Sequence, residues 1–243
     1  MPDHHPHHGL SRRRLLTIAS AVTTGIAGAT TLPQPASAAP PTTPGTDATT
    51  TPGTRPTTTQ NHWPIIDAHH TRTFQIEGSD TTVTLRCDTD QPGDTAIILL
   101  HVARRIHYEL TTLTPGDIHG HTTDRTTGTG LDTNYRSGTA ITIRPGAYPP
   151  GTTGNLYPHE VATIRDILLD CQAVVRWGGD DPTHPSEGHF QIDVPPNDPN
   201  LTRVAATIRD WHTQPGHGAG APAEPSTPNR RSAAQALAHT QRR

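Results

Sequence analysis

The spacing of apolar residues predicts three helices in this chain of 243 residues. In each one, apolar side chains recur every three or four positions and therefore share one helix face. The second helix opens with proline, which is favoured in a first helical turn. These helices are predicted at 95–113, 158–172 and 198–212. The basic and histidine side chains of the first helix fall mostly off its apolar face and are predicted to be solvated: His101, Arg104, Arg105 and His107.

Alternating apolar and polar residues predict short strands around these helices. Residues 73–76 and 82–86 alternate on either side of a turn signal and so predict a hairpin. The sequence therefore predicts an α+β fold, with a small, mainly antiparallel sheet packed by about three helices. Further strands are predicted at 118–121, through Ile141 and Ile143, at 173–177 and at 189–194.

Both ends of the chain have compositions that seldom build a hydrophobic core. Only 30% of the residues are hydrophobic, while glycine and proline number 21 and 25, so the folded part is expected to be shorter than the chain. Residues 39–60 are Pro/Thr-rich and predict an extended linker. Residues 213–243 are rich in Gly, Pro and Ala and predict a disordered tail. One folded domain is therefore expected, over residues 61–212.

The first 38 residues have the features of a twin-arginine signal peptide. Arg12-Arg13-Arg14 precedes an apolar run from Leu15 to about Leu32, and Ala36-Ser37-Ala38 supplies a small-x-small cleavage pattern. The alternative is a membrane anchor, but threonines and glycines interrupt the run, which lacks the ~20 strongly apolar residues of a membrane span. We therefore expect a secreted or cell-wall-associated protein that has no membrane span after cleavage.

An exported protein meets an oxidising environment, in which cysteines tend to pair. The chain has two cysteines, Cys87 and Cys171. A disulfide between them is predicted, with a stabilisation of roughly 4 kcal/mol because it would close a long loop. Two separate buried thiols are the alternative. A zinc site is not expected from these two residues, since they lack the C-x-x-C spacing.

Charge and absent motifs argue against several other functions. The net charge of −3 and the pI near 6.6 give no basic face for nucleic acid. The chain contains no lysine, so it has no P-loop for phosphate binding. It also lacks the G-x-S-x-G elbow of serine hydrolases. Nucleic-acid binding, nucleotide hydrolysis and serine-hydrolase chemistry are therefore not expected.

Two stretches carry the most specific pattern in the chain. Residues 133–142 read T-N-Y-R-S-G-T-A-I-T, and residues 186–189 read S-E-G-H after the run V-V-R-W-G-G-D at 174–180. They resemble the motifs S-x-H-x-x-G-x-A-x-D and D/E-x-x-H of the zinc D-alanyl-D-alanine carboxypeptidase family, the vancomycin-resistance type with a hedgehog-like fold. That family trims peptidoglycan stem peptides. Gly138, Ala140 and His189 match its motifs.

The remaining motif positions carry substitutions. The resemblance places the first zinc histidine of the family at Tyr135, the zinc aspartate at Thr142 and the general base at Ser186. Neutral hydroxyl groups are poor zinc ligands, and a serine hydroxyl is a poor base near neutral pH. The sequence therefore predicts a peptidase-like protein with an inactivated zinc site, in which His189 is the one retained metal ligand.

The resemblance also implies a cleft that binds peptidoglycan stem peptides. In the family, a tryptophan at the position of Trp177 walls the substrate cleft, and Arg176, His189 and Tyr135 would line the cleft beside it. The substrate-binding arginine of the family falls on Thr122, so Arg125 is only a displaced candidate for that role. We expect such a protein to be a monomer.

Two alternative functions stay open from the sequence. The protein would be an active zinc carboxypeptidase or endopeptidase if Glu187 or Asp180 served as the base. His119 and His121, on one side of a predicted strand, would then complete a zinc site with His189, or Tyr135 would bind as phenolate. The second alternative is a structural secreted module without a cleft ligand.

Overall fold

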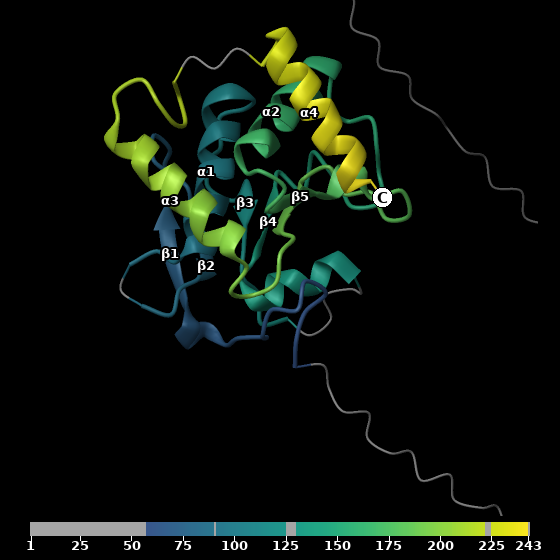
Figure 1. The fold of residues 1–243 in the computed structure, drawn as a ribbon. Coiled ribbons are helices and arrows are strands. Elements are labelled where there is room, and N and C mark those ends of the chain that lie inside the picture. The colour runs from purple at the N-terminus through teal and green to yellow at the C-terminus, as the bar shows by residue number, and fades with distance from the viewer. Residues whose placement is uncertain (1–56, 90, 125–129, 222–224, 243) are drawn as a thin grey trace, which may run out of the picture. The chain divides into compact units, whose positions relative to one another are not determined.

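The computed structural model describes residues 57–89, 91–124, 130–221 and 225–242. The predicted signal peptide and most of the predicted linker lie outside these residues. Figure 1 shows the arrangement of the elements. They are β1 (Thr71–Gln75), β2 (Thr82–Arg86), α1 (Asp94–Glu109), β3 (Ile118–His119), the 3-10 helix η2 (Gly130–Ser137), β4 (Ala140–Ile143), α2 (Pro158–Asp170), β5 (Val175–Trp177), β6 (His189–Ile192), α3 (Pro199–Thr213) and α4 (Pro228–Gln241), with the short 3-10 helices η1 (Ala68–His70) and η3 (Gly178–Asp180).

The strands form two antiparallel sheets, which confirms the predicted α+β class. β1 and β2 form a hairpin, as their alternating pattern predicted. The larger sheet has the strand order β3-β4-β6-β5, and every neighbouring pair in it is antiparallel. Since directly opposed residues of paired strands share a face, this register divides the sheet into an apolar and a polar face.

The apolar face of the larger sheet belongs to the hydrophobic core. Phe190 of β6 lies opposite both Ile141 of β4 and Trp177 of β5, and all three side chains are buried. Helix α1 packs against β4 and β6, and α2 packs against β5. The core therefore fixes one side of the sheet and leaves its other side for polar residues.

The polar face carries His189 and the residues around it. Thr142 of β4 lies opposite His189 on one side and His119 on the other. Gln191 lies opposite Ala140 and Arg176. Hydrogen bonds from η2 and from residues 57–64 reach this face, so these two segments cover it. Thr59, which the sequence assigned to the linker, is buried there.

The C-terminal residues correct one prediction. Residues 228–241, predicted to be disordered, form α4, which lies alongside α2 in Figure 1. Ala234 and Ala238 are buried, and the Gln241 side chain donates a hydrogen bond of 2.7 Å to the Val175 carbonyl. A helix of this length is marginal alone in water, so tertiary contacts stabilise it. No helix among the described residues is long and apolar enough to cross a bilayer.

The predicted disulfide is also wrong. Cys87 and Cys171 are both buried, and they are not bonded to each other. The Cys87 thiol donates to the carbonyls of Thr89 and Gln91 in the loop before α1. Cys171 is the C-cap residue of α2, and burial raises the pKa of its thiol. The alternative prediction, two separate buried thiols, is the one that the structure shows.

Candidate functional site

Three residues of the motif pattern lie together on the polar face of the sheet. The Tyr135 hydroxyl is 2.6 Å from Nδ1 of His189, and the two rings meet edge to face with centroids 5.2 Å apart. Thr142 is the cross-strand partner of His189. The two stretches that carry the resemblance, about fifty residues apart in sequence, therefore meet at one site.

The tautomer of neutral His189 follows from its neighbour Gln191. The Gln191 amide nitrogen lies 3.2 Å from Oδ1 of Asp193, and a carboxylate accepts, so this nitrogen is the donor. Gln191 Oε1 consequently faces Nε2 of His189 at 3.0 Å and accepts from it. The His189 proton therefore sits on Nε2, and Nδ1 accepts from the Tyr135 hydroxyl.

Burial reinforces this neutral state. His189 is 1% exposed, and burial lowers its pKa because charging an imidazole without water is costly. The hydrogen bond to Gln191 and the charge of Asp132 oppose that shift. Burial also raises the pKa of Tyr135, against an opposing hydrogen bond with Thr142. Both partners of the 2.6 Å hydrogen bond are thus uncharged at neutral pH.

The residues at these positions do not fit a zinc ion. Both ring nitrogens of His189 already have hydrogen-bond partners, and the Tyr135 hydroxyl occupies the space next to Nδ1. A phenolate ligand needs a lowered pKa, whereas that of Tyr135 is raised. Within the described residues, no three His, Cys, Asp or Glu side chains are grouped closely enough to hold a metal ion.

The substitute ligands do not gather around His189. His119 is exposed and lies next to Thr142 on the polar face. His121 lies beyond the end of β3, where its Nε2 is 3.3 Å from the Ile66 carbonyl. Burial lowers the pKa of His121. The two histidines therefore do not form a ligand set with His189.

Each candidate base has a structural role in the fold. The Glu187 carboxylate accepts hydrogen bonds of 2.9–3.0 Å from the backbone N–H groups of Gly154 and Asn155. Asp180 is ion-paired with Arg165 and Arg242, and these hydrogen bonds outweigh burial and lower its pKa. Ser186 lies in a turn, where its carbonyl accepts from the His189 N–H. Neither carboxylate is placed to deprotonate a water at His189.

The prediction for one substrate residue, Trp177, is wrong, and another, Arg125, lies outside the described residues. Trp177 is 3% exposed and packs in the core on the face opposite His189, with its indole N–H donating to the Glu187 carbonyl at 2.7 Å. It therefore does not wall an open cleft. Arg176 is half-buried on the polar face, with Nε 3.0 Å from Asp193. Arg125 lies outside the described residues.

Sequence reasoning missed the polar residues that complete the network. Asn134 donates a hydrogen bond of 2.7 Å to Gln191 Oε1, and Asn61 donates 2.8 Å bonds to Thr139 Oγ1 and the Ile192 carbonyl. All of these side chains are buried. One signal was available: Gln191 stands two positions after His189 on a strand and therefore faces the same side.

Comparisons with models of protein families, with curated proteins and with solved structures gave no match. The resemblance to zinc D-alanyl-D-alanine carboxypeptidases therefore stays a prediction from its motifs. In the structure, the motif positions Tyr135, Thr142 and His189 lie together, and the Tyr135 and His189 side chains form a hydrogen bond with each other.

Acidification is expected to weaken the fold through His189. Because its folded pKa lies below the unfolded value near 6.5, the unfolded state binds more protons. The stability contributed by neutral His189 is therefore complete above about pH 6.5 and declines as pH falls towards the folded pKa. We expect His189→Gln to reduce the pH dependence of the free energy of unfolding, measured by urea titration between about pH 7.5 and 5.5.

Burial also lowers the pKa of His121 and His212, so part of the pH dependence should persist in the His189→Gln variant. The slope removed is at most about 1.4 kcal/mol per pH unit, the value for one proton. His119→Gln is the control, because that side chain is exposed and should leave the curve unchanged. Superimposable curves for His189→Gln and wild type would contradict the neutral, buried state.

Proposed function

We propose that this is an exported, peptidase-like cell-wall protein that binds peptidoglycan stem peptides and does not hydrolyse them. The observation that carries the non-hydrolytic part is the closed hydrogen-bond pair of Tyr135 and His189. Zinc peptidases need three protein ligands, a metal-bound water and a nearby base. Here the retained histidine bonds to Tyr135 and Gln191.

The positions of the charged groups support the same conclusion. A general base must lie within hydrogen-bond reach of the water that it deprotonates. Glu187 instead anchors the 154–155 backbone, and Asp180 neutralises two arginines. Activity with non-standard ligands would require these groups to leave their present partners.

Export and peptide binding rest on the sequence. The signal-peptide features of residues 1–38 support passage through the twin-arginine pathway to the cell wall. The motif resemblance supports recognition of stem peptides, and Arg176 on the polar face is the described candidate for contacting them. The proposed protein acts as a monomer and does not depend on zinc.

Peptidase and binding assays on the mature chain, from residue 39, test the two parts separately. We expect no release of D-alanine from a stem pentapeptide, with or without added zinc. We also expect retention on purified cell-wall sacculi, weakened in Arg176→Gln and unchanged in Arg203→Gln, an exposed arginine of α3. Release of D-alanine would overturn the loss of activity, whereas failure to sediment with sacculi would favour a structural module.

A further inference from the structure

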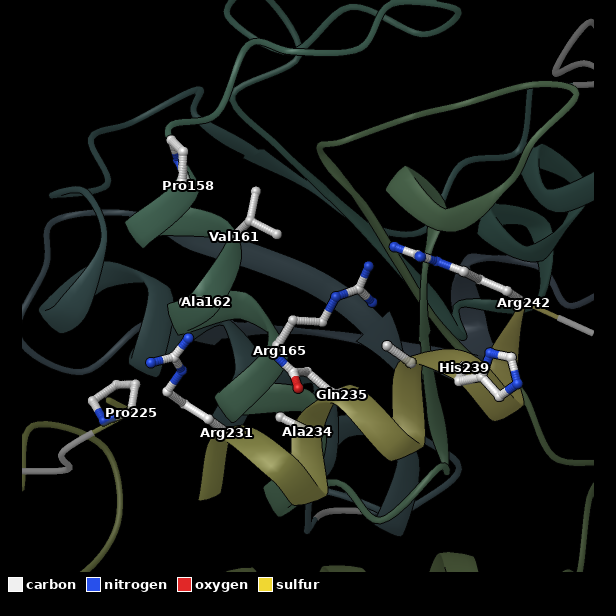
Figure 2. A pocket seen from close by; sticks show the side chains of 11 residues that line it. Pro158, Val161, Ala162, Arg165, Pro225, Arg231, Ala234, Gln235, His239 and Arg242 are labelled. Atoms are coloured by element: carbon white, nitrogen blue, oxygen red, sulfur yellow. The ribbon is translucent and has the colours of Figure 1, made fainter. Parts of the chain in front are cut away.

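A groove lies between α2 and α4, away from the polar face of the sheet. Its volume is about 420 Å³, which is within the range of small-ligand sites. Figure 2 shows the residues on its walls. They are Pro158, Val161, Ala162, Arg165, Pro225, Arg231, Ala234, Gln235, Ala238, His239 and Arg242.

Small aliphatic side chains create the space between the two helices. Val161 and Ala162 of α2 face the groove from one side, and Ala234 and Ala238 of α4 face it from the other. The two helices contact each other along this seam, where Ala234 and Ala238 are buried. The groove therefore offers aliphatic surface to a narrow ligand.

The rim of the groove has an excess of positive charge. Arg165 and Arg242 both pair with Asp180, so one carboxylate is shared between two guanidinium groups. Arg231 also lines the groove, and within the described part of the chain its guanidinium has no hydrogen bond or ion pair. Among the described residues, three guanidinium groups thus stand against one carboxylate. Figure 2 shows Arg231 extending from α4 towards α2.

We propose that this groove binds a short peptide through its C-terminal carboxylate, with Arg231 as the carboxylate-binding residue. A guanidinium group forms two parallel, charge-assisted hydrogen bonds with a carboxylate. Small aliphatic side chains of the peptide then pack against Ala162, Ala234 and Val161. This site uses none of the residues around His189, so it does not depend on the function proposed above.

Titration of the mature chain with tri-L-alanine and with its C-terminal amide tests the proposal. The two probes have the same methyl groups and differ in the terminal carboxylate. We expect the free acid to bind at least about tenfold more tightly than the C-terminal amide. Calorimetry, or the chemical shifts of the backbone N–H groups of α2 and α4, measures the binding. Equal affinity of acid and amide, or binding of neither at millimolar concentration, would overturn the proposal.

Two variants locate the binding to the groove. Arg231→Gln should weaken binding of the free acid roughly tenfold, and it breaks no contact among the described residues. Ala162→Leu should abolish binding, because the larger side chain fills an exposed part of the groove. Leucine is a good helix former, so α2 should stay intact. Arg203→Gln is the matched control for loss of charge. Unchanged affinity in Arg231→Gln, with an unchanged melting temperature, would sink the assignment.

Discussion

Replacing Arg105 by methionine is expected to lower the free energy of unfolding by about 3–5 kcal/mol. Arg105 is 1% exposed, and its guanidinium binds three carboxylates. Nη1 is 2.7 Å from Asp170, and Nη2 is 2.9 Å from Asp166. Glu109, one turn along α1, accepts from Nε at 2.6 Å. Methionine retains the aliphatic volume but leaves these carboxylates without their buried partner.

The charge balance of this cluster explains the expected size of the effect. Three carboxylates, those of Asp166, Asp170 and Glu109, pair with two guanidinium groups, those of Arg105 and of Arg230, which α4 contributes. The Arg230 side chain is 37% exposed, so it cannot replace the buried guanidinium. Burial opposes ionisation of Asp170, but the His101 imidazole, 3.5 Å away, and the guanidinium groups of Arg105 and Arg230 lower its pKa to about 2.

Urea unfolding near neutral pH measures the change. The control is Arg209→Met, which removes an exposed arginine that pairs with Asp94 at 2.7 Å. We expect that control to cost less than about 1 kcal/mol, as is usual for surface ion pairs. An Arg105→Met variant no less stable than the control would show that the carboxylates relax or protonate at little cost.

The same cluster shows why sequence reasoning failed for one face of α1. The spacing of apolar residues correctly predicted the helix, but it also predicted that the basic and histidine side chains of α1 are solvated. All four of them, His101, Arg104, Arg105 and His107, are instead buried. Helices α2 and α3, which come later in the chain, pack against α1. Helical periodicity identifies the apolar face of a helix. It cannot predict which carboxylates from distant parts of the chain will pair with the charged face.

Helix α4 was missed for a related reason. Its apolar residues are mostly alanines, which give a weak periodic signal, and the segment follows Gly- and Pro-rich residues. Its position depends on Arg230 reaching Asp166 and Asp170 of α2 and on Gln241 reaching Val175 of β5. These partners lie 60 to 66 residues earlier in the chain, so no local pattern predicts them.

The three positions of the candidate site come from the family resemblance. It assigned Tyr135, Thr142 and His189 to one site, and in the structure these residues lie together on one face of the sheet. The hydrogen bonds of the site could not be predicted from the sequence, since the tautomer of His189 depends on the positions of Gln191 and Asp193. The burial of Trp177 depends on strand register, which places it opposite Phe190 on the apolar face.

Introducing at positions 135 and 142 the ligand types that the resemblance assigns to them is expected to create zinc binding. In Tyr135→His/Thr142→Asp, the imidazole is shorter than the phenol that now reaches His189 Nδ1, so a gap opens between the two rings. An aspartate at 142 would extend from the cross-strand partner position of His189. Two imidazole nitrogens and a carboxylate match the ligand set of many zinc sites, at about 2.0–2.2 Å from the metal.

The hydrogen bond from His189 Nε2 to Gln191 prepares the site for this change. Zinc-bound histidines usually donate their second N–H group to a fixed acceptor, which orients the ring. Here that bond is already present at 3.0 Å and leaves Nδ1 to face position 135. The double variant therefore needs no rearrangement of His189 to present a ligand nitrogen.

Competition with a chromophoric chelator, together with native mass spectrometry, measures the gain. We expect the double variant to bind one zinc ion at least on the order of 100-fold more tightly than wild type. Loss of an outer-shell partner alone typically costs about 10–100-fold in metal affinity, and this variant adds two direct ligands. Tyr135→Phe/Thr142→Ala removes the same hydroxyls without adding ligands and should gain nothing. His189→Ala in the double variant should abolish the gain. A folded double variant with no gain would mean that positions 135, 142 and 189 do not form a ligand set, and it would count against the resemblance to zinc peptidases.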